Sequence, residues 1–229
     1  MHSRRPVTLA GTPLSARISP VVAVSRRPHV GTLQSSVYYS GARSSPSSER
    51  QVPTVVQVGQ QAPDFSLEGV LDGKFVDVRL SDYRGNWVVL FFYPLDFTFV
   101  CPTEIRGFAA RLNEFEDLDA QVIGVSVDSK YSHMAWVERD LGKLGYPLLS
   151  DMTREVTREY GVLLESVGHS LRGTFVVDPE GVLRYMVVHD NNIGRNMDEV
   201  LRVLQALQTG ELCPIDWRPG EATLTPPAR

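Results

Sequence analysis

Cysteine is scarce in this chain: its 229 residues include only Cys101 and Cys213. The two are 112 positions apart, which disfavours a C-x-x-C dithiol of the thioredoxin type. The five histidines are scattered without ligand spacing, so nothing in the sequence supports a metal site. Phosphate-binding glycine loops, dinucleotide fingerprints and nucleophile elbows are also missing. We therefore expect no metal and no other cofactor.

Long hydrophobic runs and basic stripes are also absent. The longest apolar run, residues 87–93, is far too short to cross a membrane, so we expect no membrane association. Residues 1–50 hold seven arginines against a single acid, Glu49, which leaves 16 basic and 26 acidic residues in the remainder. An acidic body without a basic stripe argues against nucleic acid as a partner.

The first fifty residues are rich in arginine and serine and contain no compact apolar segment. This composition is typical of an organelle transit peptide rather than of a secretory signal, with a disordered basic tail as the alternative. The dominance of arginine favours the mitochondrion, and the plastid is the alternative. We therefore divide the chain into a targeting segment at 1–50, a folded domain at 51–208 and a C-terminal arm at 209–229.

Hydrophobic periodicity predicts the secondary structure of the folded domain. We expect strands at 87–93, 121–127, 173–178 and 182–188, and helices at 103–118, 131–141, 153–160 and 196–208. The turn sequence of residues 178–181, DPEG, predicts a hairpin between the last two strands. The order β-α-β-α and then β-β-α predicts an α/β protein in which helices flank a central mixed sheet. A thioredoxin-like fold fits this order, and other three-layer α/β folds are alternatives.

Cys101 stands where the first of these helices begins, directly after a buried strand and a loop. Pro102 suits the first helical turn, because its missing N–H would have no partner there. The free amides and the positive dipole end of a helix favour a thiolate, which is the nucleophilic form of cysteine. Thr98, one turn earlier, can offer a hydroxyl to a substrate oxygen. The alternative is an inert, buried cysteine.

Four separated blocks of the chain resemble one family. Pro94, Thr98 and Cys101 form a P-x-x-x-T-x-x-C pattern, and YPLDFTFVCPTE resembles the peroxidatic site of the peroxiredoxins. SLRGTFVVD (170–178) and IGRNMDEVLRVLQALQ (193–208) resemble later blocks of the same family. GELCPIDWRPGEATL (210–224) resembles the resolving-cysteine arm of the typical two-cysteine subgroup, the alkyl hydroperoxide reductase and thiol-specific antioxidant proteins.

The resemblance implies a thiol-dependent peroxidase with a thioredoxin-like fold, acting on hydrogen peroxide and organic hydroperoxides. Cys101 would attack the O–O bond and become a sulfenic acid, and Arg172 would stabilise the thiolate and the developing charge. Glu104 would orient Arg172. Thr98 would form hydrogen bonds with the peroxide, and Pro94 would shield the sulfenic acid from water. Taken singly, each of these residues also has an ordinary structural explanation.

The resemblance also implies partners. Cys213 would condense with the sulfenic acid of a partner subunit, and thioredoxin or a similar dithiol would reduce that disulfide. This implies a homodimer, which in the family often assembles into a decamer. An idle Cys213, a chaperone-like holdase and a peroxide-relay sensor are alternatives. Arg195 is interpreted equally well as a site residue or as a solvated charge at the start of a helix. We expect Trp217 to pack the arm rather than to take part in the chemistry.

Residues 139–151, RDLGKLGYPLLSD, lack the G-G-L-G insertion that the overoxidation-prone members of the family carry. In those members the insertion slows the local unfolding that lets the two sulfurs meet. We therefore expect Cys101 to resist oxidation to sulfinic acid.

Overall fold

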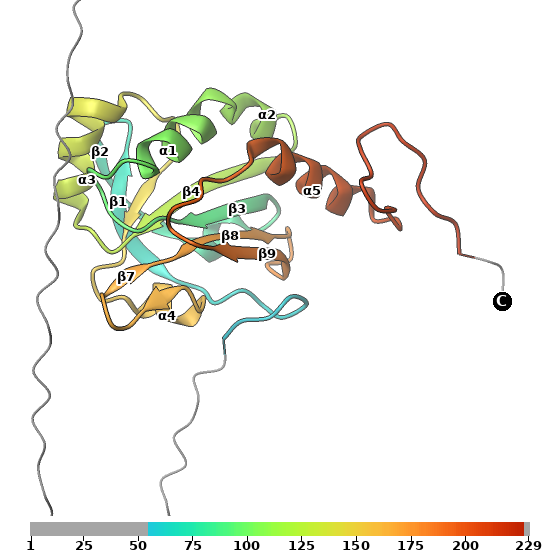
Figure 1. Ribbon diagram of the computed structural model, residues 1–229, viewed down its shortest axis with the longest axis horizontal. Helices are drawn as coiled ribbons and strands as arrows, with labels where there is room; N and C mark the ends of the chain where they lie inside the picture. The colour runs from blue at the N-terminus through green and yellow to red at the C-terminus, as the bar shows by residue number, and fades with distance from the viewer. Residues whose placement is uncertain (1–54, 227–229) are drawn as a thin grey trace, which may run out of the picture. The chain divides into compact units, whose positions relative to one another are not determined.

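The computed structural model describes residues 55–226, and the expected targeting segment at 1–50 lies outside the described residues. Seven strands form one sheet in the order β2-β1-β5-β4-β3-β8-β9 (Figure 1). These strands are β1 (Ser66–Leu71), β2 (Lys74–Arg79), β3 (Trp87–Phe92), β4 (Ala120–Ser126), β5 (Leu148–Ser150), β8 (Arg172–Val177) and β9 (Leu183–His189).

Five α-helices and a few short elements complete the described chain. The helices are α1 (Cys101–Ala110), α2 (Leu112–Glu116), α3 (Lys130–Trp136), α4 (Glu155–Glu159) and α5 (Met197–Thr209). The short elements are the 3₁₀ turn η1 (Leu80–Tyr83), the π turn η2 (Val137–Leu141), and a two-stranded ribbon of β6 (Leu163–Leu164) and β7 (His169–Ser170).

The central strand β3 decides the topology. It pairs in parallel with β4 and antiparallel with β8, so the sheet is mixed, as predicted. Every residue of β3 after Trp87 is buried, which explains why its sequence is continuously apolar rather than alternating. Because α1 follows β3 after the loop of residues 93–100, the end of this central strand sets where Cys101 lies.

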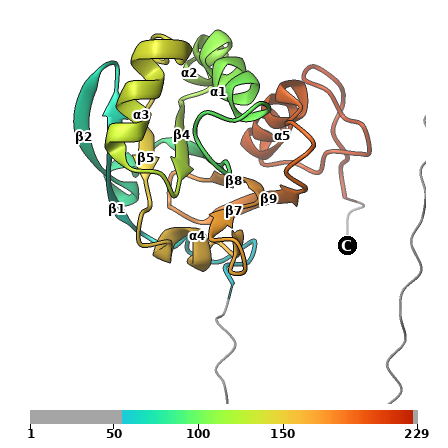
Figure 2. The same ribbon diagram turned by 60° about the vertical axis from the view of Figure 1, so that its left-hand side comes forward.

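Helices cover both faces of the sheet, which confirms the predicted layers. Phe91 belongs to the core cluster under α1, α2, α3 and α5, whereas its neighbour Phe92 belongs to the cluster that includes Tyr160 just after α4. Figures 1 and 2 show α1 and α2 on one side of the sheet and α4 on the other. The alternation follows from the two-residue period of a strand.

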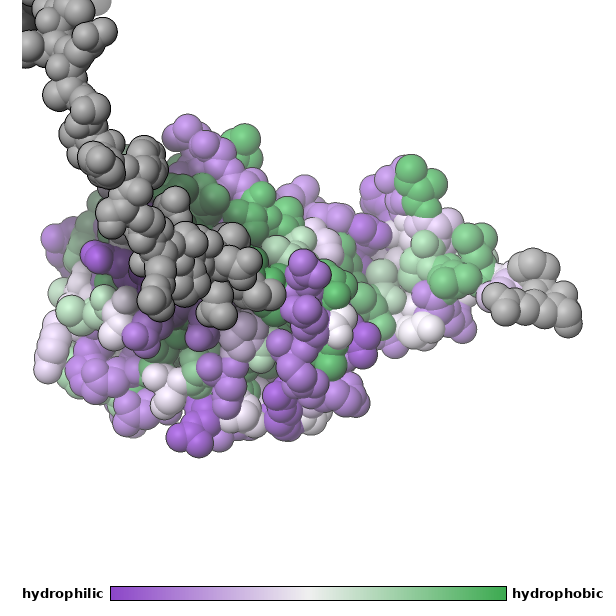
Figure 3. Space-filling model, turned by 90° about the horizontal axis from the view of Figure 1, so that it is seen from below, coloured by the Kyte–Doolittle hydropathy of each residue, from purple (hydrophilic) through white to green (hydrophobic). Residues whose placement is uncertain are grey.

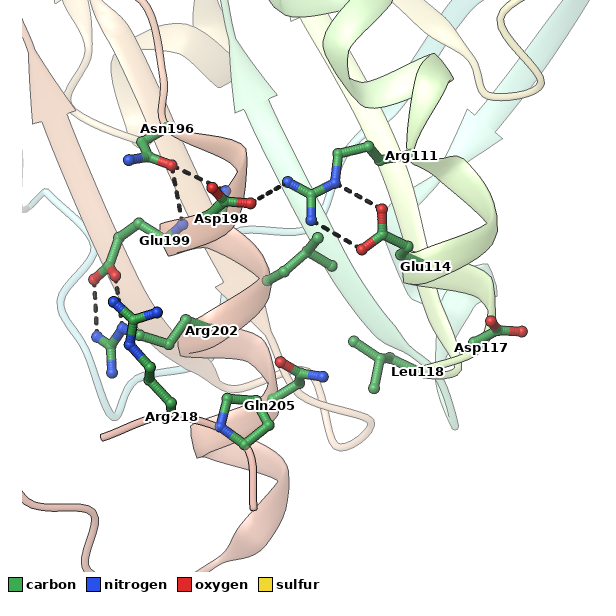
Figure 4. A pocket seen from close by; sticks show the side chains of 12 residues that line it. Arg111, Glu114, Asp117, Leu118, Asn196, Asp198, Glu199, Arg202, Gln205 and Arg218 are labelled. Atoms are coloured by element: carbon green, nitrogen blue, oxygen red, sulfur yellow. Dashed lines mark hydrogen bonds and ion pairs between the residues drawn. The ribbon is translucent and has the colours of Figure 1, made fainter. Parts of the chain in front are cut away.

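One predicted helix was wrong in its bounds and in its continuity. The helix expected at 103–118 begins at Cys101 and is interrupted at Arg111, whose backbone leaves the helical region at φ −119°. The Arg111 side chain pairs with Glu114 of α2 and with Asp198 of α5 (Figure 4). This break sets α2 at a new angle, so that Phe115 enters the core.

The N-terminal hairpin β1–β2 and the strand β5 were not predicted. The hairpin turns at Asp72-Gly73, where both residues have positive φ, 46° and 75°. Such a turn is the usual signal of a two-residue hairpin, so the sequence did contain it. Strand β5 has only three residues and carries too little periodicity to be recognised.

The residues after α5 form a closed loop on the end of that helix. Leu224 N donates to Leu212 O at 2.8 Å, and Trp217 is buried, with its indole nitrogen donating to Glu221 O at 3.1 Å. Arg202 of α5 donates to Trp217 O. Trp217 therefore packs the arm, as expected. Ile215 remains 91% exposed, and hydrophobic atoms show at the surface of the arm in Figure 3.

Gly124 and Gly107 offer a matched test of the core. A Cβ on Gly124 would lie 2.7 Å from Phe91 Cζ and 2.8 Å from Leu148 Cδ2, whereas a Cβ on Gly107 in α1 would meet nothing closer than 3.7 Å. We expect Gly124→Ala to lower the free energy of unfolding by about 1–3 kcal/mol through overpacking. Gly107→Ala should raise it by about 0.5–1 kcal/mol, because glycine weakens a helix interior.

Urea unfolding of the reduced protein at one fixed concentration measures both changes, since assembly would make the midpoint depend on concentration. Equal effects of the two substitutions would contradict the packing described around Gly124.

Candidate active site

Cys101 is the first residue of α1 and has no exposed surface. Pro102 occupies the first turn, as predicted, and the N–H groups of Thr103 and Glu104 both point back to Val100 O. A thiol in this position stands at the positive end of the helix and is closed off from solvent. The sulfur is therefore placed where negative charge is favoured and solvent is excluded.

Arg172 contacts the sulfur directly. It is the first residue of β8, the strand next to β3, and its Nη1 donates to Cys101 Sγ at 3.4 Å. Its Nε and Nη2 both donate to Asn191 O, at 3.0 and 2.9 Å. These two bonds fix the plane of the guanidinium, so the remaining nitrogen points at the sulfur.

Glu104 joins two arginines. One carboxylate oxygen pairs with Arg172 Nη1, and the other accepts a hydrogen bond from Arg195 N at 3.0 Å. Arg195 Nη1 lies 2.8 Å from that second oxygen as an ion pair, although its N–H bonds are not aligned for a hydrogen bond. The side chains of Glu104, Arg172 and Arg195 are no more than 3% exposed. The structure thus brings Glu104 and Arg172 together with Cys101.

Arg195 is a site residue that the sequence did not distinguish from a solvated helix charge. Its Nε donates to Thr174 Oγ1 at 2.7 Å, and its Nη2 donates to the carbonyls of Gly173 and Phe92. Burial lowers the pKa of Arg195, and the nearby carboxylate of Glu104 opposes that shift. No sequence signal separates the two interpretations, since only the tertiary fold turns residue 195 inward.

The charges of this cluster do not cancel. Two guanidinium groups share one carboxylate, and the other partners of Arg172 and Arg195 described above are neutral carbonyls, a hydroxyl and the sulfur. One unit of positive charge therefore remains beside Cys101. An unbalanced buried charge is costly in a medium of low dielectric constant. A thiolate at Cys101 would neutralise it.

Pro94 and Thr98 lie in the loop between β3 and α1. Pro94 is buried, and Thr98 donates its hydroxyl proton to Leu95 O at 2.9 Å. The lone pairs of that hydroxyl therefore stay free to accept. A hollow of about 380 Å³ is lined in part by Thr98 and Pro102, which stand on either side of Cys101 in the sequence.

A second buried network holds this loop to α3. Asp96 accepts hydrogen bonds from Tyr93 OH at 2.9 Å and Ser132 Oγ at 2.7 Å, and it contacts His133 Nδ1 at 2.8 Å. The other ring nitrogen of His133 lies 3.1 Å from Leu149 O, which can only accept, so that nitrogen carries a proton. Burial, and then the charge of Asp96, raise the pKa of Tyr93 well above its usual value.

Cys213 does not join Cys101 within the chain. It is half-buried at the C-terminal end of α5, 3.8 Å from Ala206 O and 3.6 Å from Thr209 Oγ1. Arg195, which contacts Glu104, stands just before the opposite end of this helix. The 13 residues of α5 span about 20 Å, whereas a disulfide needs Cα atoms within about 7 Å. The two cysteines of one chain are therefore separated.

Residues 55–226 contain neither a cluster of possible metal ligands nor a helix that could span a membrane. No cluster of three or more histidine, cysteine or acidic side chains there could hold a metal ion. No helix in the same range is both long and apolar enough to cross a bilayer. One hollow, of about 610 Å³ between α2 and α5, is lined mainly by charged side chains, several of which pair with one another (Figure 4).

Comparison with known proteins gives one consistent result. The model of the AhpC/TSA family matches residues 58–186. The chain is similar to the putative peroxiredoxin YkuU of Bacillus subtilis, with 58% identity over 175 residues, covering 73% of this chain and 97% of that protein. It is 51% identical over 182 residues to the mitochondrial thioredoxin-dependent peroxide reductase of Drosophila melanogaster, covering 75% and 78%.

The similarity extends to plant proteins and to solved structures. The chloroplastic 2-Cys peroxiredoxin BAS1 of Spinacia oleracea is 48% identical over 218 residues, covering 91% of this chain and 82% of that protein. The reduced 2-Cys peroxiredoxin of Plasmodium vivax superposes with a TM-score of 0.70 at 38% identity, covering 72% of this chain and 91% of that one.

The charge cluster predicts a large effect of Glu104→Gln. The amide keeps the shape of the side chain but leaves Arg172 and Arg195 as buried cations without an anionic partner. We expect the free energy of unfolding to fall by about 3–5 kcal/mol, measured by urea titration of the reduced protein.

Glu114→Gln is the matched control, because Glu114 also pairs with an arginine but its side chain is 46% exposed. It should change stability little, since solvent screens a surface ion pair. Similar losses in the two variants would show that the cluster around Glu104 is not a buried charge network.

Proposed function

The chain belongs to the AhpC/TSA family and is a thiol-dependent peroxidase of the 2-Cys peroxiredoxin type, and from this premise we propose that Cys101 is its peroxidatic cysteine. The observation that carries the assignment is the contact of Arg172 Nη1 with Cys101 Sγ at 3.4 Å, inside a buried cluster with one excess positive charge. A thiolate there is both stabilised by charge and poorly solvated, which suits a nucleophile.

The first step follows from this arrangement. The Cys101 thiolate attacks one peroxide oxygen, the O–O bond breaks, and the leaving oxygen takes a proton to give water or an alcohol. The sulfur becomes a sulfenic acid. Arg172 stabilises the thiolate and the charge that develops on the peroxide, and Glu104 holds Arg172 in place. Thr98 accepts a hydrogen bond from the peroxide, because its own proton is donated to Leu95 O, and Pro94 keeps water from the sulfenic acid.

Arg195 completes this set as a second buried guanidinium behind Glu104. Because it binds the side chain that orients Arg172, it acts through Glu104 rather than on the sulfur. Its hydrogen bonds to Gly173 O and Phe92 O also tie the site to β8 and β3. We assign it a positioning role.

Cys213 resolves the sulfenic acid from a partner subunit. The support is geometric: Cys213 lies beyond the C-terminal end of α5, a helix about 20 Å long whose other end follows the site residue Arg195, and it stands on a loop with exposed Leu212 and Ile215. The sulfenic acid and the Cys213 thiol condense to an intersubunit disulfide with loss of water. Thioredoxin or a similar dithiol then reduces that disulfide.

A homodimer accounts for one of the two edges of the sheet. Within residues 55–226, strand β9 has β8 on one side and no strand on the other, and edge strands tend to pair with another chain. An apolar hollow of about 230 Å³ lies beside it, lined among others by Tyr185, Val187 and Ile193. Exposed aromatic residues elsewhere, Phe99 and the pair of Phe75 and Tyr131, support further assembly of dimers into a decamer.

Residues 1–50 act as an organelle transit peptide in this proposal, ahead of a peroxidase domain at 51–208 and the arm at 209–229. Their arginine content favours the mitochondrion. The observation that favours the plastid is that the spinach chloroplastic relative aligns with 91% of this chain, against 75% for the Drosophila mitochondrial one.

Localisation can be measured with a fluorescent protein carrying residues 1–50 at its N-terminus. We expect import into mitochondria of plant or algal cells, because the segment is rich in arginine and poor in acids. Accumulation in plastids would replace the mitochondrial assignment, and diffuse fluorescence would contradict the targeting role altogether.

The mechanism predicts a peroxide-driven dimer. On a non-reducing gel, the reduced full chain treated with one equivalent of hydrogen peroxide should shift to a disulfide-linked dimer that dithiothreitol reverses. Neither Cys101→Ser nor Cys213→Ser should shift, because each lacks one sulfur of the bond. A shift confined to the monomer would mean that the arm folds back on its own chain, contrary to the separation by α5.

Turnover separates the peroxidase from a chaperone-like holdase. Consumption of peroxide with thioredoxin should stop in Cys101→Ser, whereas suppression of aggregation of a client protein would survive the same substitution if the holdase were the main role. A peroxide-relay sensor would instead pass its disulfide to a second protein faster than to thioredoxin.

A further inference from the structure

Phe97 stands in the loop before Cys101 with an unusual backbone. Its φ is 55°, a left-handed conformation that is rare for an aromatic residue and persists only where neighbouring contacts hold it. The side chain is 44% exposed, yet two residues hold its ring. The ring centre lies 5.5 Å from that of Trp136 and 4.6 Å from the guanidinium carbon of Arg139.

Trp136 and Arg139 hold the Phe97 ring in different ways. Trp136 ends α3 and is buried, so it forms a fixed wall. Arg139 lies in the π turn η2, and its side chain is 68% exposed. The Asp140 carboxylate holds the Arg139 guanidinium through Nε and Nη2. Because the Arg139 side chain is exposed, its guanidinium can lie on the Phe97 ring and can also move away from it.

The same turn also contacts α1. Arg106 of α1 donates to the backbone carbonyl of Asp140, next to Arg139. The π turn therefore touches the chain on both sides of Cys101, through Phe97 before it and Arg106 after it. The hollow lined by Thr98 and Pro102 lies between these two contacts.

Cys101 cannot form a disulfide from its buried position. Its side chain has no exposed surface, and a second sulfur must approach to about 2.05 Å with a restricted dihedral angle. The loop and the first turn of α1 must therefore open before Cys213 can react. Contacts that hold Phe97 belong to the closed loop and oppose this opening.

We propose that Arg139 is a positioning residue of the peroxidase cycle, whose guanidinium on the Phe97 ring sets how often the Cys101 loop opens. Opening decides between two fates of the Cys101 sulfenic acid. In the open loop it condenses with the Cys213 thiol to a disulfide and water. In the closed loop a second hydroperoxide oxidises it to sulfinic acid, and that hydroperoxide is reduced to water or an alcohol. The inference rests on the two-cysteine mechanism proposed above.

The size of the effect follows from the kind of contact. A cation over an aromatic ring at an exposed site changes an equilibrium about two- to fivefold. Because the closed loop is the main form, such a change multiplies the open fraction and leaves the closed fraction nearly constant. Reaction of Cys101 with the first peroxide, which needs the closed loop, is therefore unaffected.

Rapid mixing of the reduced full-length protein with hydrogen peroxide tests the proposal through tryptophan fluorescence, to which Trp136 beside Phe97 contributes. In Arg139→Ala we expect an unchanged peroxide-dependent first phase and a disulfide-forming second phase that is about two- to fivefold faster. Mass spectrometry after turnover in excess peroxide should show a correspondingly smaller share of sulfinic acid. Arg139→Lys, which keeps the charge, should recover part of the wild-type value.

A double-substitution cycle tests whether Arg139 acts through Phe97. Phe97→Leu removes the ring, so adding Arg139→Ala to it should have no further effect on the second phase. Arg158→Ala is the control, because Arg158 is also exposed and paired with an acid, Glu165, but lies on α4. It should leave both phases unchanged.

Several results would overturn the proposal: an unchanged second phase in Arg139→Ala, a first phase slowed in parallel, or additive effects of Arg139→Ala and Phe97→Leu. A change of assembly of Arg139→Ala on gel filtration would also overturn it, since the effect would then arise between subunits. Failure of the two-cysteine mechanism is distinct, because the wild-type protein itself would form no disulfide with Cys213.

Discussion

The site depends on a single buried carboxylate. Glu104 sits one turn into α1 and pairs with Arg172 from the start of β8 and with Arg195 from just before α5. Three segments that are far apart in the sequence therefore meet at one side chain, and the sheet order that puts β8 beside β3 makes the meeting possible. Because the carboxylate balances only one of the two cations, the second positive charge is left for the sulfur of Cys101. The same ion pairs thus hold the fold together and leave a buried cation beside the sulfur.

Burial of the sulfur creates a conflict. Water must be excluded for the charges to act strongly on Cys101, but a fully buried sulfur cannot reach a second cysteine. The loop between β3 and α1 must therefore stay closed while Cys101 reacts with the peroxide and must open before Cys101 can form a disulfide. Asp96, in the middle of the loop, is fixed because it binds Tyr93 and His133 below the surface. The next residue, Phe97, is held by an exposed contact, which is easier to break. Opening can then start at Phe97 without disturbing the buried network.

The sequence predicted the long, strongly periodic elements well. Strand β3 and helix α5 were found within a residue or two, because their buried faces are continuous in the sequence. The break at Arg111 was missed, since it depends on ion pairs with Glu114 and Asp198 that exist only in the folded protein. For the site, the motif around Cys101 is local and could be recognised from its spacing. Arg195 could not be assigned, because nothing in its neighbourhood along the chain shows that its side chain turns inward.

The position of Cys213 has a physical consequence for the whole cycle. Cys213 lies beyond one end of α5, and the site residue Arg195 stands just before the other end, about 20 Å away along the helix. At the same time, Ile215 near Cys213 is exposed to water, and strand β9 is an edge strand of the sheet that residues 55–226 form. Each is unfavourable in an isolated subunit and would be relieved by a second copy. The arm that carries Cys213 would thus favour association of two subunits, and association would bring Cys213 to the Cys101 of the partner. Assembly and completion of the site would then be the same event.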